Sequence, residues 1–171
     1  MHTTSFKDFL LRDQLCKAIA TCGFEHPSEV QQQCLPHSLL GLDILCQAKA
    51  GMGKTAVFVL TVLNRLTEAN DTSEVSCMVL AHTRELAFQI AKEFDRFSQN
   101  LSMKTMVIIG GENTEDQIDK LKETKPQIVV GTPGRVLALI KKRVLETKNV
   151  KIFIIDECDK MLKELGKHLQ A

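Results

Sequence analysis

The 171-residue sequence lacks any run of about 18 to 20 apolar residues, the length that a membrane-spanning helix needs. Residues 1–10 do not combine a basic segment with an apolar one, so they do not form a secretory signal, and we expect the chain to stay inside the cell without membrane contact. Internal repeats, low-complexity tracts and Gly/Ser linkers are also missing, so no domain boundary is indicated. With 44% hydrophobic and 25% charged residues, the composition is that of a globular domain and excludes disordered or collagen-like classes.

The six cysteines form no Cys-x-x-Cys pair and have no Cys/His spacing typical of a metal site. Several of them lie in apolar runs, where cysteine behaves as a small hydrophobic residue. We therefore expect reduced thiols rather than disulfides or zinc ligands.

Charge of either sign is not in excess, because 22 basic residues against 21 acidic ones give a formal net charge of +1. Any binding of nucleic acid must then arise from a local basic patch rather than from the field of the whole molecule.

Short apolar runs, most of them rich in Val and Ile, alternate with longer segments of helical period. This order predicts an α/β fold in which a mostly parallel sheet is covered by helices on both faces. The expected strands lie at residues 43–47, 76–81, 104–109, 127–131 and 151–155.

The helical segments carry their own signals. One helix should begin near Lys54 and be deeply packed, because residues 56–66 are apolar almost all round. A second shows one buried stripe at Leu86, Ile90, Phe94 and Phe97. Further helices are expected over 13–22, stopped by Gly23, and over 27–40 as one or two pieces, with capping-box pairs at Ser28/Gln31 and Thr114/Gln117.

The strongest local pattern is Ala-Lys-Ala-Gly-Met-Gly-Lys-Thr at residues 48–55, the phosphate loop, which stands between an expected strand and an expected helix. Glycines let backbone N–H groups surround phosphate oxygens, and the helix N-terminus adds its positive end. Lys54 would reach the terminal phosphates and Thr55 would ligate magnesium. The usual phosphate-loop pattern has Gly where this chain has Ala48. The alternative to phosphate binding is a glycine-rich turn with a solvated lysine. The strand–loop–helix context favours phosphate binding.

An acidic pair, Asp156-Glu157, follows the strand expected at 151–155. Groups that hold a cation and activate water belong at the carboxyl ends of neighbouring strands. Asp156 would hold Mg²⁺ through water, and Glu157 would position or deprotonate the attacking water, with Lys54 as the third catalytic residue. The alternative is a solvent-facing helix cap. We expect the phosphate loop and the acidic pair to meet at one rim of the sheet, around a magnesium-bound triphosphate.

Six elements resemble, in order, the motifs of DEAD-box ATP-dependent RNA helicases. Asp-Glu-Cys-Asp at 156–159 resembles the DECD variant of the DEAD box, and residues 23–31 resemble the Q motif. Besides the phosphate loop, the others are Ala-His-Thr-Arg-Glu-Leu at 81–86, Gly110-Gly111 and Thr-Pro-Gly-Arg at 132–135, which resemble motif Ia, the GG element and motif Ib. The resemblance covers nearly the whole chain.

This resemblance implies that residues 1–171 are an N-terminal RecA-like ATP-binding domain, with 1–41 as the Q-motif segment and 42–171 as the P-loop core. Relatives continue with a Ser-Ala-Thr motif and a second RecA-like lobe that carries arginine fingers, and neither occurs in this sequence. We therefore expect a domain truncated at its C-terminus, a less well packed C-terminal segment, weak ADP or ATP binding and almost no hydrolysis.

The resemblance further implies that Gln31 binds the adenine edge, because its amide offers both a donor and an acceptor, and that Phe6 packs on the base. The alternatives are that Gln31 only caps a helix and that Phe6 only covers the core. The implied nucleotide-binding residues are Phe6, Phe24, Gln31, Ala48, Ala50, Gly51, Met52, Gly53, Lys54 and Thr55, with Mg²⁺ held by Thr55 and Asp156.

RNA contacts are implied for seven residues: Thr83, Arg84, Gly110, Gly111, Thr132, Gly134 and Arg135. Thr83 and Thr132 stand where helix N-caps are expected and Pro133 suits a first helical position, so N–H groups there can receive phosphates. Such contacts read the sugar-phosphate backbone, so single-stranded or duplex RNA would bind without sequence preference. The alternative is a plain helix start with a surface arginine. Residues 141–143 are expected to be a solvated helix face.

The DECD spelling, and His82 where most relatives have Pro, most resemble the branch that serves pre-mRNA splicing and mRNA export. The implied function is the ATP-binding lobe of an RNA helicase that remodels RNA–protein complexes in the nucleus, with export and splicing factors as partners. The alternative is a non-enzymatic RNA- or protein-binding lobe that competes with or regulates a full-length helicase. A GTPase is disfavoured, because residues 124–127 and 147–150 lack the aspartate of an Asn/Thr-Lys-x-Asp motif.

Overall fold

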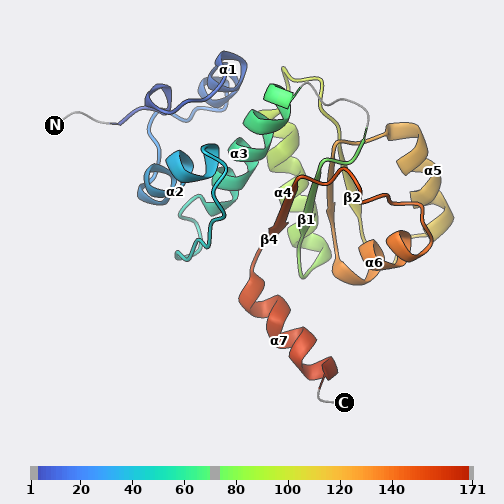
Figure 1. Cartoon of the computed structure of the whole chain (residues 1–171). Helices are drawn as coiled ribbons and strands as arrows, with labels where there is room; N and C mark the ends of the chain where they lie inside the picture. Colours follow the sequence, from blue (N-terminus) through green and yellow to red (C-terminus); the bar gives the residue numbers. More distant parts are fainter. Residues whose placement is uncertain (1–3, 70–73, 170–171) are drawn as a thin grey trace. The chain divides into compact units, whose positions relative to one another are not determined.

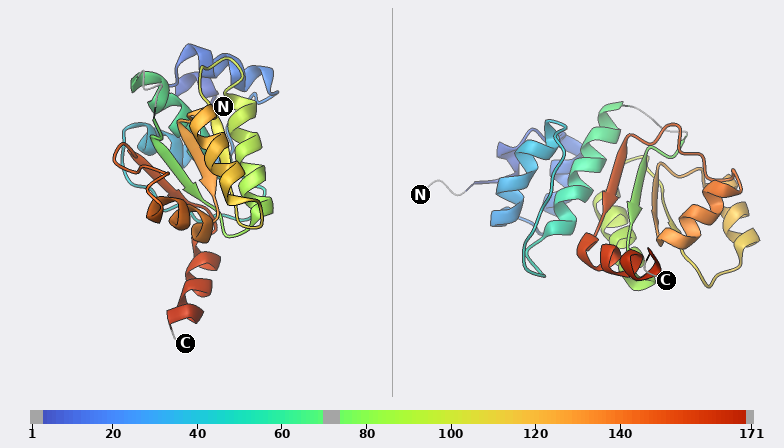
Figure 2. Two further views of the ribbon diagram at one scale, coloured as in Figure 1. Left: turned by 90° about the vertical axis from the view of Figure 1, so that its right-hand side faces the viewer. Right: turned by 60° about the horizontal axis from the view of Figure 1, so that its bottom comes forward.

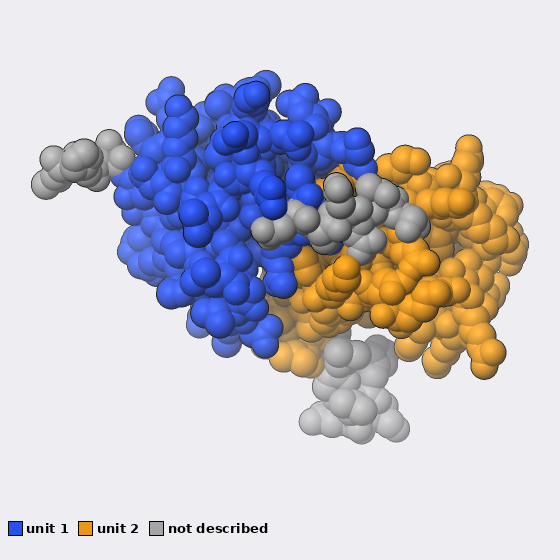
Figure 3. Space-filling model, turned by 45° about the horizontal axis from the view of Figure 1, so that its top comes forward, with its two compact units in different colours: residues 1–71, 93–102 blue, residues 72–92, 103–171 orange. Residues whose placement is uncertain are grey.

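The structure is a computed structural model that describes residues 4–69 and 74–169. The chain divides into two compact units, one made of residues 1–71 and 93–102 and the other of residues 72–92 and 103–171 (Figure 3). By this grouping, residues 42–71 fall in the same unit as residues 1–41. The subdivision into a Q-motif segment (1–41) and a P-loop core (42–171) stays a prediction. No helix in the described part of the chain is long and apolar enough to span a bilayer.

Within its described residues, the first unit contains only helices and loops (Figure 1). Its elements are η1 (Phe6–Asp8), α1 (Asp13–Thr21), α2 (Glu29–Leu39), α3 (Lys54–Ala69) and residues 93–97 of α4 (Arg84–Phe97). As predicted, α3 begins at Lys54, and Val59, Val62 and Leu63 have no exposed surface.

Polar contacts attach the neighbouring helices to α3. Ser38 Oγ of α2 and Thr61 Oγ1 of α3 share a buried hydrogen bond of 2.7 Å. The backbone N–H of Arg12, at the start of α1, donates to Asn64 Oδ1 at 2.9 Å. The predicted stop of α1 is confirmed, because Gly23 has a φ of 79°, a conformation that glycine adopts readily.

The second unit is built on a four-stranded sheet with the order β2-β3-β1-β4, and every pair of neighbours is parallel. The strands are β1 (Cys77–Leu80), β2 (Thr105–Ile108), β3 (Ile128–Gly131) and β4 (Ile152–Ile155), and each falls within a range predicted from the sequence. Two views show them side by side (Figure 2). The helices of this unit are residues 84–92 of α4, α5 (Thr114–Thr124), α6 (Pro133–Lys141) and α7 (Cys158–Leu169).

Both faces of the sheet are buried at the central strands β1 and β3, as the alternating pattern predicted. One face packs against α5 and α6, through Met78, Met106, Ile108 and Val129 on the strands and Ile118, Leu121, Val136 and Leu139 on the helices. The opposite face carries Cys77, Val79, Ile128 and Val130, which have no exposed surface. Burial raises the pKa of the Cys77 thiol, so this cysteine behaves as a core residue.

The strand predicted at residues 43–47 does not form. Residues 42–49 have no regular structure, and Leu42 and Leu45 are 58% and 89% exposed. An apolar run becomes a strand only where a neighbouring strand satisfies its backbone groups, and within the described residues nothing pairs with this one. β4, which pairs with β1 alone among the described strands, likewise leaves Phe153 55% exposed.

The capping box predicted for Thr114 and Gln117 is wrong. The N-cap of α5 is Asn113, whose side chain accepts from the Glu115 N–H at 2.9 Å. Asparagine is a stronger N-cap than threonine, so the residue one position earlier takes that role. Gln117 is instead 1% exposed and turned inward.

Two residues, Asp156 and Glu157, separate β4 from α7, which projects from the sheet (Figures 1 and 2). Leu162 is 66% exposed. The expectation of loose packing near the C-terminus otherwise concerns side chains beyond residue 163, which lie outside the described part of the chain.

Candidate functional site

The phosphate loop enters α3 through two glycines whose conformation other residues rarely adopt. Gly51 and Gly53 have φ values of 79° and 80°. A Cβ at Gly53 would also collide with the side chain of Gln31. Both positions therefore favour glycine through their positive φ, and at Gly53 the absence of a Cβ also leaves room for the side chain of Gln31.

The Q-motif segment holds the phosphate loop by hydrogen bonds to its carbonyl oxygens. Ser28 Oγ donates to Met52 O at 2.9 Å, and Gln31 Nε2 donates to Gly53 O at 3.3 Å. Gln31 Oε1 accepts from the Ser28 N–H at 2.9 Å, so the predicted capping box is confirmed. The role of Gln31 toward adenine stays a prediction, and it would use the second amide hydrogen and the second lone pair of Oε1.

Lys54 lies folded back on the loop that precedes it. Its Nζ donates to Lys49 O at 2.8 Å and to Ala48 O. Thr55 follows as the second residue of α3 and is half-buried, while Ala50 and Met52 are exposed. A bound phosphate would compete with these carbonyl oxygens for the ammonium group of Lys54.

Phe6 and Phe24 belong to an aromatic cluster of the first unit. Phe6 is 4% exposed, with its ring centroid 6.2 Å from Phe9 and 6.5 Å from Phe24. The Arg96 guanidinium lies 5.0 Å from the centroid of Phe24 and donates to Cys22 O at 2.8 Å. Such contacts are expected if Phe6 only covers the core, which is the alternative to its packing on the adenine base. Packing of Phe6 on the base stays a prediction.

In the second unit, the acidic pair connects β4 to α7. Asp156 Oδ1 accepts from the Glu157 N–H at 2.9 Å, and Glu157 has a φ of 49°. Glu157 Oε2 accepts from Lys160 Nζ at 2.8 Å and lies 3.1 Å from His82 Nδ1. The hydrogen bond to Glu157 raises the pKa of Lys160, so the ammonium group stays charged beside the carboxylate.

The phosphate loop and the acidic pair belong to different compact units. Their meeting around one Mg²⁺ ion, with Thr55 and Asp156 as ligands, stays a prediction. Among the described residues, no three His, Cys, Asp or Glu side chains gather as a metal site would need. A hydroxyl, a carboxylate and phosphate oxygens are nevertheless a donor set that suits Mg²⁺, which keeps several waters.

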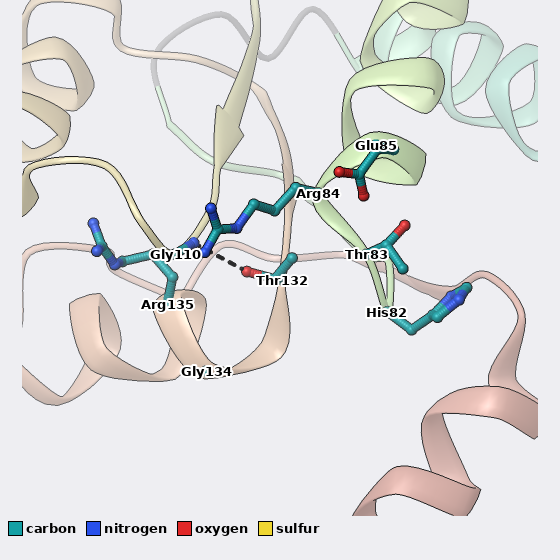
Figure 4. Close-up of a pocket in the computed structure, with 8 residues that line it drawn as sticks. All are labelled: His82, Thr83, Arg84, Glu85, Gly110, Thr132, Gly134 and Arg135. Carbon is teal, nitrogen blue, oxygen red and sulfur yellow. Dashed lines mark hydrogen bonds between the residues drawn. The ribbon is translucent and has the colours of Figure 1, made fainter.

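The residues predicted to contact RNA converge on one pocket of the second unit, called the basic pocket here (Figure 4). Its volume is about 640 Å³, and it is lined by His82, Thr83, Arg84, Glu85, Gly110, Thr132, Gly134 and Arg135. Of the predicted set, only Gly111 is not part of the lining, although it touches Arg84. The residues of these three motifs thus form one surface, although Thr83 and Arg135 are 52 positions apart in the sequence.

Two helix N-termini open into the basic pocket. Thr83 caps α4, because its Oγ1 accepts from the Leu86 N–H at 3.1 Å. Thr132 is the N-cap residue of α6 and Pro133 is the first helical residue, as predicted. Thr132 Oγ1 accepts from the Gly110 N–H at 3.3 Å rather than from its own helix. The first N–H groups of α6 have no intrahelical partner and favour anions.

Both arginines of the basic pocket are placed by specific neighbours. Arg84 lies over Gly111, where a φ of 87° and the absence of a Cβ give the guanidinium room. Arg135 Nη1 donates to Gln117 Oε1 and its Nη2 donates to Glu112 O, both at 2.9 Å. The pocket therefore presents two oriented cations beside two positive helix ends, and Glu85 is the carboxylate in the lining.

Sequence reasoning missed the residues that place these groups. Gln117 donates through Nε2 to Ile109 O at 3.0 Å and to Glu112 Oε2 at 2.7 Å while it holds Arg135. Because Gln117 was predicted to be part of a capping box, its contact with Arg135 was not considered. Lys160 was also missed, although its spacing of three residues from Glu157 in a helical segment is a usable signal.

Comparison with known proteins gives the following matches. The family model described as DEAD/DEAH box helicase matches residues 28–171. The chain is 54% identical over 166 residues to the human ATP-dependent RNA helicase DDX39A and likewise 54% identical over 166 residues to the ATP-dependent RNA helicase WM6 of Drosophila melanogaster. Each alignment covers 96% of this chain, but only 38% and 39% of the relatives, so the chain spans well under half of their length.

Among solved structures, a DEAD box protein from the hyperthermophile Methanococcus jannaschii superposes with a TM-score of 0.87 at 38% sequence identity. The match covers 94% of this chain and 43% of that chain. It confirms the predicted RecA-like α/β fold.

Proposed function

Because the chain belongs to the DEAD/DEAH box helicase family, we propose that it serves as the ATP-binding lobe of an ATP-dependent RNA helicase that remodels RNA–protein complexes. The proposal rests above all on the basic pocket, where residues from three separate motifs gather two arginines and two helix N-termini. A surface of this kind suits a chain of phosphates.

In this proposal the basic pocket binds the RNA backbone. N–H groups at the start of α6 and the guanidinium groups of Arg84 and Arg135 receive phosphate oxygens, while Thr83 and Thr132 hold the helix ends in place. None of these groups is positioned to select among bases, so binding is independent of sequence.

The phosphate loop binds the triphosphate of ATP. Its positive-φ glycines and the ammonium group of Lys54 fit phosphate oxygens, and Lys54 leaves the carbonyl oxygens of residues 48 and 49 when they arrive. Mg²⁺, held by Thr55 and Asp156, would neutralise charge on the phosphates. Glu157 positions the attacking water and accepts its proton.

We place this activity in mRNA splicing and export in the nucleus, with export and splicing factors as partners. Support comes from the DECD spelling and from the 54% identity to two proteins named as RNA helicases. Removing a close homologue's N-terminal lobe and supplying this one would test the assignment through export of polyadenylated RNA.

Binding of a labelled single-stranded oligouridine to the 171-residue chain, followed by fluorescence anisotropy, tests the RNA role. We expect Arg84→Ala to weaken binding by roughly tenfold, because a charged hydrogen bond contributes about 1.5 kcal/mol or more. Lys141→Ala, which removes an exposed cation from α6 outside the pocket lining, is the matched control and should bind as the unmodified chain does.

Equal losses in the two variants would show that only general charge matters and would contradict the pocket assignment. The same titration with ATP present separates the enzyme lobe from the non-enzymatic alternative. A lobe that only binds RNA or protein would show RNA binding that nucleotide leaves unchanged.

A further inference from the structure

His82 joins the basic pocket to the acidic pair. β1 and β4 are parallel neighbours with Leu80 opposite Ile155, so the residues that follow them emerge side by side at the carboxyl edge of the sheet. His82 follows β1 and Glu157 follows β4, and His82 Nδ1 lies 3.1 Å from Glu157 Oε2. In Figure 4 the imidazole of His82 is directed away from Thr132 and Arg135.

The burial of His82 supports a structural role for its contact with Glu157. The His82 side chain is 12% exposed, and its Nδ1 is buried without an aligned hydrogen-bond partner among the described residues. A buried polar atom of this kind is costly unless an acceptor comes into line with it. Glu157 Oε2 is the acceptor within reach.

The backbone of Glu157 also indicates a constrained position. A φ of 49° is uncommon for a residue with a side chain and costs free energy that the surroundings must offset. Lys160 Nζ and His82 Nδ1 both approach Oε2 of its carboxylate. Lys160 reaches it from within α7, whereas His82 reaches it from the lining of the basic pocket.

We propose that His82 is a positioning residue that holds the Glu157 carboxylate and links it to occupation of the basic pocket by RNA phosphates. The inference rests on the proposed function for its ligand. His82 directly precedes Thr83 and Arg84, so a phosphate bound there fixes the segment that carries the imidazole. Because the contacts of His82 and Lys160 are both made to Oε2, Oε1 stays available to the attacking water of the proposed function.

Carbon-13 NMR of the glutamate side-chain carboxyl groups tests this in the 171-residue chain, with the Glu157 signal assigned by its loss in Glu157→Gln. Spectra are recorded for the unmodified chain, His82→Ala and His82→Asn, each with and without single-stranded oligouridine. Asparagine places an amide N–H near the position of Nδ1 and should restore the contact. His37→Ala, at an exposed histidine of α2, is the matched control.

Without RNA, we expect His82→Ala to shift the Glu157 signal and His82→Asn to return it toward its original position. With RNA, the signal should move in the unmodified chain, His82→Asn and His37→Ala, and stay in place in His82→Ala. Thermal melting shows that each variant is folded, and anisotropy shows whether RNA is bound.

A Glu157 signal that responds to bound RNA equally with and without His82 would overturn the inference. So would a ligand-free signal that His82→Ala leaves unchanged. If the unmodified chain binds no oligouridine, the proposed function fails and the RNA link fails with it, whereas the ligand-free comparison still decides whether His82 holds Glu157.

Discussion

The basic pocket and the phosphate loop are held in different ways. The pocket is formed by the ends of regular elements, where α4 and α6 begin and where the chain turns after β2. The phosphate loop has no strand before it, and the side chains of Ser28, Gln31 and Lys54 hold its carbonyl oxygens. The pocket therefore has its helix N–H groups and guanidinium groups in place, with Arg135 held by Gln117 and Glu112. In the phosphate loop, by contrast, Lys54 must leave the carbonyl oxygens of residues 48 and 49 before its ammonium group can receive a phosphate.

The largest effect is expected from Lys54→Ala in the phosphate loop. A charged hydrogen bond to phosphate contributes about 1.5–3 kcal/mol, so ATP affinity should fall roughly 10- to 100-fold. Isothermal titration measures the change, and Lys49→Ala removes an exposed lysine of the same loop as the control. Unchanged ATP affinity in Lys54→Ala would remove the phosphate loop from the site, while RNA binding at the basic pocket would be unaffected.

Gly53→Ala against Gly51→Ala asks whether Gln31 sets the shape of the phosphate loop. Both glycines have positive φ, so each change should cost about 1–2 kcal/mol in backbone strain. Only at Gly53 would the new Cβ also collide with Gln31, whereas Gly51 has open space around it. Gly53→Ala should therefore lower the free energy of unfolding more than Gly51→Ala does, and chemical denaturation of the two variants measures this difference. Equal losses would show that Gln31 moves aside freely and does not brace the loop.

Elements whose signals are local were predictable from the sequence. The strands at residues 77–80 and 128–131 are apolar runs buried on both faces, and Ser28 and Thr132 mark helix starts that need only a few neighbouring residues. The run at residues 43–47 carries the same local signal but no strand, because pairing depends on a distant neighbour that composition does not reveal.

The same distinction applies to the candidate site. Motifs named the residues of the basic pocket, and the structure brings all but Gly111 into its lining. They did not name Gln117, because a buried glutamine that holds an arginine 18 residues away leaves no periodic trace. The contact between His82 and Glu157 was equally hidden, since only the parallel register of β1 and β4 makes the two residues neighbours.

Gln117→Leu tests whether the basic pocket depends on a buried side chain, as the phosphate loop does. The change keeps a similar volume but removes the acceptor that holds Arg135. A net hydrogen bond contributes about 1 kcal/mol, so oligouridine affinity should fall roughly three- to tenfold. Gln89→Leu, at an exposed position of α4, is the control. Equal affinity in both variants would show that Arg135 finds phosphate without Gln117.

The smallest effect concerns the salt dependence of RNA binding, and it separates the charge of Arg135 from its orientation. For a single strand, each neutralised phosphate adds about 0.7 to the slope of log affinity against log salt. Arg135→Ala should lower that slope by about 0.7, while Lys141→Ala should leave it unchanged. Gln117→Leu keeps the charge of Arg135, so it should reduce affinity at every salt concentration with little change in slope. If Gln117→Leu lowers the slope as much as Arg135→Ala does, Arg135 no longer contacts the phosphate once Gln117 is removed. RNA binding in the basic pocket would then depend on a buried glutamine that positions Arg135, just as the phosphate loop is held by Gln31.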